Sequence, residues 1–200
     1  MFKKAIEVIV TIRKKGLLEF MVYGLRLVFN KLFSFIKIFF LRLRGYDIDY
    51  SVTLRGGIFF FQSTKNSISI NGGSIGNGIR ISTGGNGIIS MGKGILVDDF
   101  TFIMAHEKIE IGDNTKIASF CFITDFNHKF TNKNKNLVEQ GYDTKPVMIG
   151  RNVWIGTHSV VLPGVSIGDR SVIGAGSIVT KDIPSNSIAV GNPAKVIKKF

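Results

Sequence analysis

Branched apolar residues recur at every sixth position through the C-terminal part of the chain. The repeat runs from about Pro146 to Lys195, and glycine often follows the apolar residue, as at Gly150 and Gly156. A period of six is neither the helical period nor a simple two-residue alternation. It suits a short strand followed by a tight corner, with one branched side chain pointing inward in each unit. The positions in register are Ile149, Ile155, Val161, Ile167, Ile173 and Val179.

Three such units complete a triangular coil of about 18 residues, and each coil stacks on the next, as in other solenoids. The inward residues of one coil should then contact those of the following coil. The repeat therefore predicts three stacked pairs: Ile149 with Ile167, Ile155 with Ile173, and Val161 with Val179.

The same pattern is weaker upstream. Over residues 46–95, isoleucines recur between glycines but without a clean spacing of six, and the period sharpens over 95–123. We interpret the irregular part as early coils of the same solenoid. The glycines of GGSIGNG at 72–78 are interpreted as coil corners, because no helical pattern follows them as a phosphate-binding loop requires.

The repeat is interrupted between about 125 and 146. This segment is polar and leaves the coil as a loop, which begins with a histidine, His128. Long loops in compact folds are usually functional or disordered. The histidine favours a functional loop.

The first 44 residues follow a helical pattern instead, and we expect helices over 1–15 and 17–44. Apolar residues of the second helix fall on one side of a helical wheel. Its charge-free stretches are far shorter than the roughly 20 residues that span a bilayer. A basic amphipathic helix rich in Phe and Leu suits an anionic membrane surface; the alternative is packing on the β-helix or another subunit. The predicted apolar side holds Leu18, Met21, Leu25, Phe29, Leu32, Ile36, Phe39 and Leu43.

Composition sharpens this division. Of the net charge of +12, residues 1–44 hold +8, with ten Lys or Arg against two Glu. No nucleic-acid-binding motif accompanies this charge, so nucleic acid is not the predicted partner. The single cysteine, Cys121, permits no intrachain disulfide and is expected to be a small core residue. No signal peptide is apparent at the N-terminus.

Three segments carry a family resemblance: VWIG at 153–156, GAGSIVTKDIP at 174–184 and GNPAKVI at 191–197. With the repeat, they resemble the acetyl-CoA-binding segment of the hexapeptide-repeat acyltransferases, including galactoside and maltose acetyltransferases. The resemblance covers 95–200 well, 46–94 loosely and the N-terminal arm not at all. It implies an all-β fold, a left-handed parallel β-helix over 46–188. A helical arm (1–45) precedes this β-helix, and a basic tail (189–200) follows it.

The resemblance also implies a site for acetyl-CoA between neighbouring chains of a homotrimer. Trp154 would lie along the pantetheine arm, although a surface tryptophan can also cover a subunit contact. Gly156 and Ala175 would keep the coil wall low, and Thr157 would bond near the thioester. The remaining donor residues are Thr180 and three lysines that would meet the CoA phosphates: Lys181, Lys195 and Lys198.

His128 is the predicted general base. In the family a histidine follows an IGDN-type coil and opens the extruded loop, and Ile111-Gly112-Asp113-Asn114 precedes His128 here. A sugar hydroxyl needs a base within hydrogen-bond reach as it attacks. Imidazole accepts a proton near neutral pH and can return it to the leaving thiolate. Asp125 is the candidate orienting partner, with capping of the loop corner as the alternative.

Two further carboxylates, Asp98 and Asp99, are candidates for acceptor binding. Relatives of the galactoside type place an asparagine in this neighbourhood, so Asp98 departs from their residue type. A zinc site is not predicted, because His106, His128 and His158 lack the spacing of the histidine sites in β-helix carbonic anhydrases. His106 and His158 are expected on the surface.

Together these features predict a cytoplasmic, trimeric O-acetyltransferase at the inner face of the membrane. It would move acetyl from acetyl-CoA to a sugar hydroxyl in cell-surface polysaccharide biosynthesis, without a metal and without an acyl-enzyme on Cys121. N-acetylation of a nucleotide-linked amino sugar is the main alternative, although such enzymes usually carry an additional nucleotide-binding domain. A non-catalytic binding scaffold is the alternative from another class.

Overall fold

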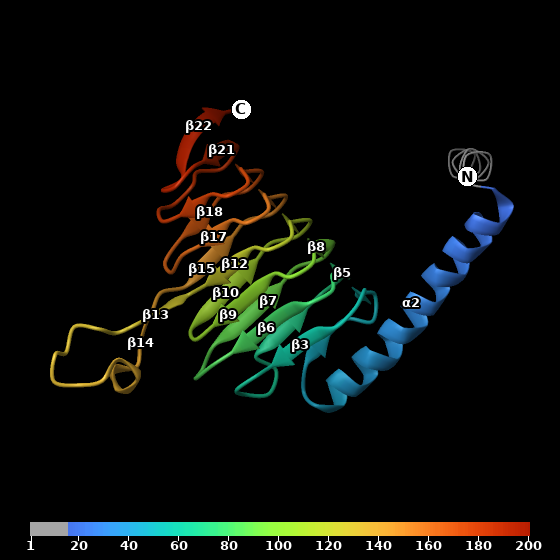
Figure 1. The fold of residues 1–200 in the computed structure, drawn as a ribbon, viewed down its shortest axis with the longest axis horizontal. Helices are drawn as coiled ribbons and strands as arrows, with labels where there is room; N and C mark the ends of the chain where they lie inside the picture. Colours follow the sequence, from blue (N-terminus) through green and yellow to red (C-terminus); the bar gives the residue numbers. More distant parts are fainter. Residues whose placement is uncertain (1–15) are drawn as a thin grey trace.

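The computed structural model describes residues 16–200 and has the predicted architecture, a parallel β-solenoid with one helix before it (Figure 1). Each coil contributes one strand to each of three parallel sheets, which we name A, B and C. Sheet A contains β1 (Asp47–Ile48), β4 (Ile68–Ile70), β7 (Ile88–Met91), β10 (Lys108–Ile111), β15 (Val147–Ile149) and β18 (Ser166–Ile167).

Sheet B is the longest, because two strands at the C-terminal end of the chain, the second of them antiparallel, extend it beyond the other two. It contains β2 (Thr53–Leu54), β5 (Gly73–Ile75), β8 (Ile95–Val97), β11 (Lys116–Ile117), β16 (Trp154–Ile155), β19 (Val172–Ile173), β21 (Ser187–Val190) and the antiparallel β22 (Lys195–Lys199). Sheet C contains β3 (Ile58–Phe61), β6 (Ile79–Thr83), β9 (Phe102–Ala105), β12 (Phe122–Thr124), β17 (Val160–Val161) and β20 (Ile178–Val179).

The predicted stacking of the C-terminal coils is confirmed. Each pair is aligned in a parallel ladder, and these inward side chains are buried at 3% exposure or less. A column of branched residues inside three parallel sheets removes apolar surface from water along the length of the solenoid. The register joins Ile149 to Ile167, Ile155 to Ile173, and Val161 to Val179.

The early coils belong to the same three sheets, as interpreted, but they are longer. Successive coils of sheet A place Ile70 22 positions after Ile48 and Met91 21 positions after Ile70, and Ile111 follows after 20. The later coils repeat after 18, as from Ile149 to Ile167. Extra residues at the early corners therefore hide the period of six without changing the inward stack.

One corner of the coils is built in the left-handed backbone region by bulky residues. Phe100, Phe120 and His158 have φ of 58°, 61° and 58°, in a column between sheets B and C. Such φ values are unfavourable for bulky side chains unless their surroundings hold them. Here the rings of Phe100 and Phe120 stack at 5.3 Å, and those of Phe120 and His158 at 4.9 Å.

Helix α2 (Leu17–Leu43) matches the second predicted helix and docks on the first coil. Ile38 is fully buried, and the hydroxyl of Ser34 accepts a 2.9 Å hydrogen bond from the Leu54 amide. The helix expected over 1–15 lies outside the described residues. Within 16–200, no helix is both long and apolar enough to cross a bilayer.

The predicted apolar side of this helix does not pack on the β-helix. Leu18 lies outside the described side chains, and the other members are between 45% and 69% exposed, because Ser34 and Ile38 lie on the side that docks. Packing on the β-helix of the same chain is therefore wrong for these residues, which are Met21, Leu25, Phe29, Leu32, Ile36, Phe39 and Leu43.

Candidate active site

The predicted loop leaves the solenoid after β12 as a short antiparallel hairpin. Strand β13 (Phe126–His128) pairs with β14 (Tyr142–Thr144), and a 3-10 turn (η1, Leu137–Gln140) lies between them. The Lys145 amide donates to the Asp125 carbonyl at 2.8 Å, which closes the base of the loop. His128 thus lies on a hydrogen-bonded strand rather than on a free loop tip.

Asp125 holds this hairpin to the preceding coil. Its carboxylate is fully buried and accepts hydrogen bonds from three consecutive backbone amides, those of His106, Glu107 and Lys108, at 2.7, 2.8 and 2.6 Å. A buried charge needs such partners to offset its desolvation. Capping of the corner, the alternative considered above, is thus a role that Asp125 has. Orientation of His128 by Asp125 stays a prediction.

An aromatic cluster surrounds the base of the hairpin. The His106 ring lies 4.0 Å from the ring of Phe126 and 4.3 Å from that of Tyr142, centroid to centroid. The His128 ring is exposed and lies 4.6 Å from that of Tyr142. His106, expected on the surface, is therefore partly buried, whereas His158 is exposed as expected.

Burial lowers the pKa of His106, and the charge of His128 adds to this effect, while the Asp125 carboxylate opposes it. The ordinary pKa of histidine is about 6.5. A lowered pKa favours the neutral form of His106 at pH 7.

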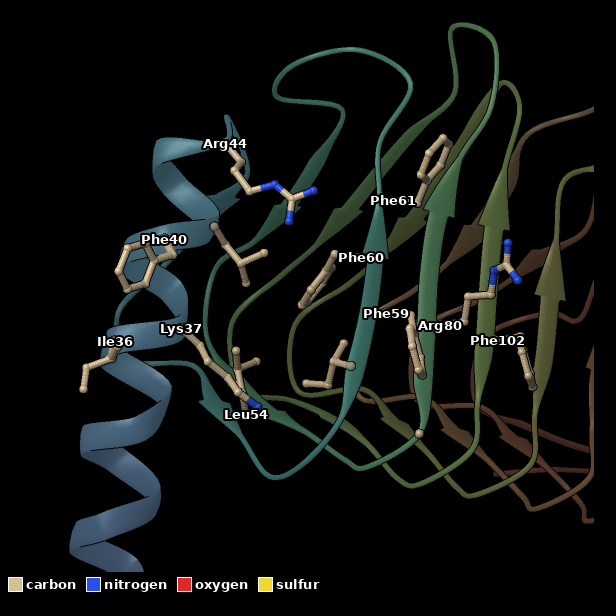
Figure 2. A pocket seen from close by; sticks show the side chains of 13 residues that line it. Ile36, Lys37, Phe40, Arg44, Leu54, Phe59, Phe60, Phe61, Arg80 and Phe102 are labelled. Carbon is tan, nitrogen blue, oxygen red and sulfur yellow. The ribbon is translucent and has the colours of Figure 1, made fainter.

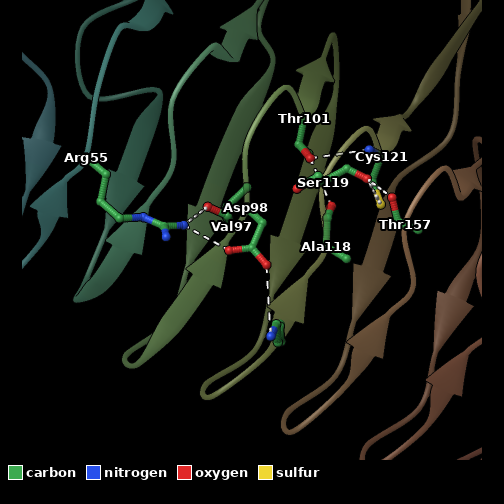
Figure 3. A network of polar contacts seen from close by, with 9 residues as sticks. Arg55, Val97, Asp98, Thr101, Ala118, Ser119, Cys121 and Thr157 are labelled. Atoms are coloured by element: carbon green, nitrogen blue, oxygen red, sulfur yellow. Dashed lines mark hydrogen bonds and ion pairs between the residues drawn. The ribbon is translucent and has the colours of Figure 1, made fainter. Parts of the chain in front are cut away.

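The two acceptor candidates differ in their surroundings, and Figure 3 shows those of Asp98. The Asp98 carboxylate forms an ion pair with Arg55 at 2.9 Å and with Lys116 at 4.0 Å. It lies at the end of β8 and is partly exposed. The Asp99 carboxylate accepts a hydrogen bond from the Asn77 amide at 2.8 Å, which holds a corner. The Asp98 carboxylate is therefore paired with two cations, whereas the Asp99 carboxylate accepts a structural hydrogen bond from the backbone.

Trp154 and the residues after it line sheet B and the corner between sheets B and C. Trp154 is half-exposed and lies beside Lys116 in the ladder. A Cβ on Gly156 would come within 2.6 Å of the Ala175 amide nitrogen, so a glycine there lets adjacent coils approach closely. The role of Gly156 beside the pantetheine arm stays a prediction. The Thr157 hydroxyl donates to the Ser119 carbonyl at 2.6 Å. Bonding to a thioester requires Thr157 to give up this bond.

The four other donor candidates are exposed at two places. Thr180 and Lys181 follow β20, at the end of sheet C. Lys195 and Lys198 lie on β22, at the edge of sheet B.

Within one chain, the candidate base therefore lies apart from the residues predicted to bind the acceptor and the thioester end of acetyl-CoA. Asp98, Trp154 and Thr157 lie on sheet B or at the start of sheet C, whereas His128 follows the end of a sheet C strand. A three- to four-residue strand separates these ends by on the order of 10 Å. Arg55, Lys116 and Tyr142 join the site without having been predicted. In the part of the chain that the structure describes, no cluster of three potential metal ligands occurs.

Comparisons with known proteins confirm the resemblance. Residues 146–181 match the family model described as bacterial transferase hexapeptide (six repeats). A putative lipopolysaccharide biosynthesis O-acetyl transferase, WbbJ of Escherichia coli K12, is 38% identical over 68% of this chain and 74% of its own length. The galactoside O-acetyltransferase of the same organism is 46% identical over 52% of this chain and 47% of its own length.

Solved structures agree. A maltose O-acetyltransferase from Clostridium difficile 630 superposes with a TM-score of 0.55 at 34% identity, over 75% of this chain and 71% of that one. A galactoside acetyltransferase in complex with coenzyme A superposes with a TM-score of 0.54 at 30% identity, over 77% and 65%. The chain belongs to the hexapeptide-repeat acetyltransferases. Within that family it is an acetyl-CoA-dependent O-acetyltransferase.

The Asp125 contacts predict a large cost of removing its carboxylate. Asp125→Ala should leave three amides without their acceptor and lower the free energy of unfolding by about 3 kcal/mol or more. Asp113→Ala is the matched control, because the Asp113 carboxylate accepts one backbone amide, that of Lys93, and should cost about 1 kcal/mol. Urea unfolding measures both. Equal stability of the two variants would contradict the role of Asp125 as the anchor of the hairpin.

Proposed function

We propose that this enzyme acetylates a hydroxyl of a sugar in cell-surface polysaccharide biosynthesis, with His128 as general base. The observation that supports it most is the exposed His128 imidazole on a strand anchored by a buried carboxylate. Such a side chain is accessible to an acceptor and held in place. The names of the relatives above support a sugar as the acceptor.

The proposed reaction is a direct transfer. The sugar hydroxyl attacks the thioester carbonyl of acetyl-CoA while His128 takes the hydroxyl proton. The tetrahedral intermediate then collapses, the C–S bond breaks, and the CoA thiolate receives the proton from His128. The new bond joins the sugar oxygen to the acetyl carbon.

Cys121 is unsuited to form an acyl-enzyme. Its thiol is buried and lies 3.2 Å from the Gly156 carbonyl oxygen. Burial raises the pKa of this thiol, which keeps it in the less nucleophilic form.

A homotrimer completes the proposed site. In one chain, Asp98 and Trp154 lie at strands of sheet B, whereas His128 follows the far end of a sheet C strand. A neighbouring copy that presents its sheet B to the hairpin brings the two groups together. We therefore propose that each site takes His128 from one copy and Trp154 from the next.

The arm is proposed to bind the inner face of the membrane. Besides its exposed apolar residues, helix α2 with its C-cap carries five basic residues, two of which, Lys37 and Arg42, donate to carbonyls of the β-helix. The five are Arg26, Lys31, Lys37, Arg42 and Arg44. Apolar burial at the headgroup boundary together with attraction to anionic lipids is the usual mode for such helices. Polysaccharide precursors attached to lipid would be acetylated there.

His128→Ala should lower turnover by about 10²–10⁴-fold, the usual contribution of a general base, with acetyl-CoA binding retained. Thiol release from acetyl-CoA with galactose or maltose as acceptor measures this, and Asn127→Ala on the same strand is the matched control. Near wild-type turnover by His128→Ala would refute the assignment. Faster release with glucosamine than with either neutral sugar would favour transfer to nitrogen.

The arm can be tested by vesicle flotation. Replacing Leu25, Phe29 and Leu32 by serine removes three exposed apolar side chains, so binding to vesicles of anionic phospholipid should fall by at least tenfold. The matched control replaces two exposed apolar residues of the loop, Phe130 and Val138, by serine. Unchanged flotation of the triple variant, or its dissociation into smaller oligomers, would contradict a membrane role for this side.

A further inference from the structure

An open apolar groove separates the end of α2 from the outer face of sheet C (Figure 2). Its volume is about 870 Å³. Ile36 and Phe40 line it from the helix, and Phe59 and Phe61 line it from β3. The two phenylalanines of β3 are 71% and 63% exposed, so the groove presents aromatic surface that nothing in the described chain covers.

A single arginine lies in the middle of this apolar wall. Arg80 on β6 pairs directly with Phe59 on one side and Phe102 on the other. It is exposed, and no carboxylate of residues 16–200 forms an ion pair with it. A guanidinium between aromatic rings is suited to bind a phosphate in two places at once.

The groove continues toward the candidate base. A second cavity of about 140 Å³ shares Phe61 and Arg80 with the first and ends at His106. His106 contacts Tyr142, which in turn contacts His128. A path therefore runs from the helix, past Arg80, to the aromatic cluster at the base of the hairpin.

We propose that this groove binds a long-chain phosphate lipid that carries the acceptor sugar. The hydrocarbon chain lies between α2 and sheet C, the phosphate binds Arg80, and the sugar extends toward the hairpin that bears His128. The inference rests on the proposed function for the identity of the attached sugar. The binding of the lipid phosphate itself is inferred from the lining of the groove and does not depend on the proposed function.

Charge favours this occupant over a second copy of the chain. Lys37, Arg44 and Arg80 line the groove, and no Asp or Glu among the described residues does. A second chain of net charge +12 offers mainly more cations, whereas an anionic lipid offers both the charge and the apolar chain. The exposed apolar side of α2 beside the groove suits entry of a lipid from a membrane surface.

The test is direct binding of farnesyl phosphate to the full-length protein, measured by calorimetry without acetyl-CoA. Farnesol and inorganic phosphate, the two halves of the probe, should each bind at least tenfold more weakly. Arg80→Gln should weaken farnesyl phosphate binding by at least tenfold, and Phe59→Ser should weaken it as well. Arg151→Gln is the matched control, because Arg151 is an exposed arginine outside the groove.

Three outcomes would overturn the proposal. They are no binding by the wild-type protein, equal binding of farnesol, and loss of the native oligomer in Phe59→Ser, which would assign this face to a subunit contact. A kinetic comparison tests whether the bound lipid presents the acceptor sugar. Arg80→Gln should reduce kcat/KM for farnesyl-phosphate-linked galactose and leave kcat/KM for free galactose unchanged. Binding of the lipid phosphate without any sugar acetylation would support the groove as a lipid-binding site and refute the proposed function.

Discussion

The structure depends on the stacking of branched apolar residues inside three parallel sheets. Because Ile155 of one coil lies over Ile173 of the next, the coils keep a common register from the first strand to the last. Parallel ladders then fix the outward side chains in columns as well, such as Phe59, Arg80 and Phe102. The interior is uniform, so differences between one coil and another are confined to outward positions, corners and insertions.

The candidate chemistry lies at such departures. The hairpin that bears His128 replaces a corner, and the buried Asp125 carboxylate ties it to the backbone of the preceding coil. Asp98 and Trp154 lie on sheet B, joined through Lys116. A rigid solenoid cannot fold these two groups together within one chain. In the proposed trimer, the hairpin with His128 of one copy lies against sheet B, with Asp98 and Trp154, of the next copy.

The regular part of the fold could be predicted from sequence because each coil there has 18 residues, as between Val161 and Val179. The early coils could not be placed, since their lengths of 20 to 22 residues shift the inward position from one coil to the next. For the same reason, no sequence pattern predicted that Arg55 forms an ion pair with Asp98. On α2, the helical wheel predicted the wrong docking side, because it considered only apolar residues. The side that docks includes Ser34, whose hydroxyl accepts a hydrogen bond from the Leu54 amide. The position of Tyr142 beside His128 could not be predicted either, because it depends on the register of the β13–β14 hairpin.

The composite site is the central claim, and mixed oligomers test it most directly. His128→Ala and Trp154→Ala chains would each be inactive alone and would be co-assembled in equal amounts. If each site takes His128 from one copy and Trp154 from the next, about a quarter of the sites regain both residues by random assembly. Thiol release from acetyl-CoA with galactose should then recover to about a quarter of the wild-type rate. No recovery in a verified mixed trimer would contradict the account.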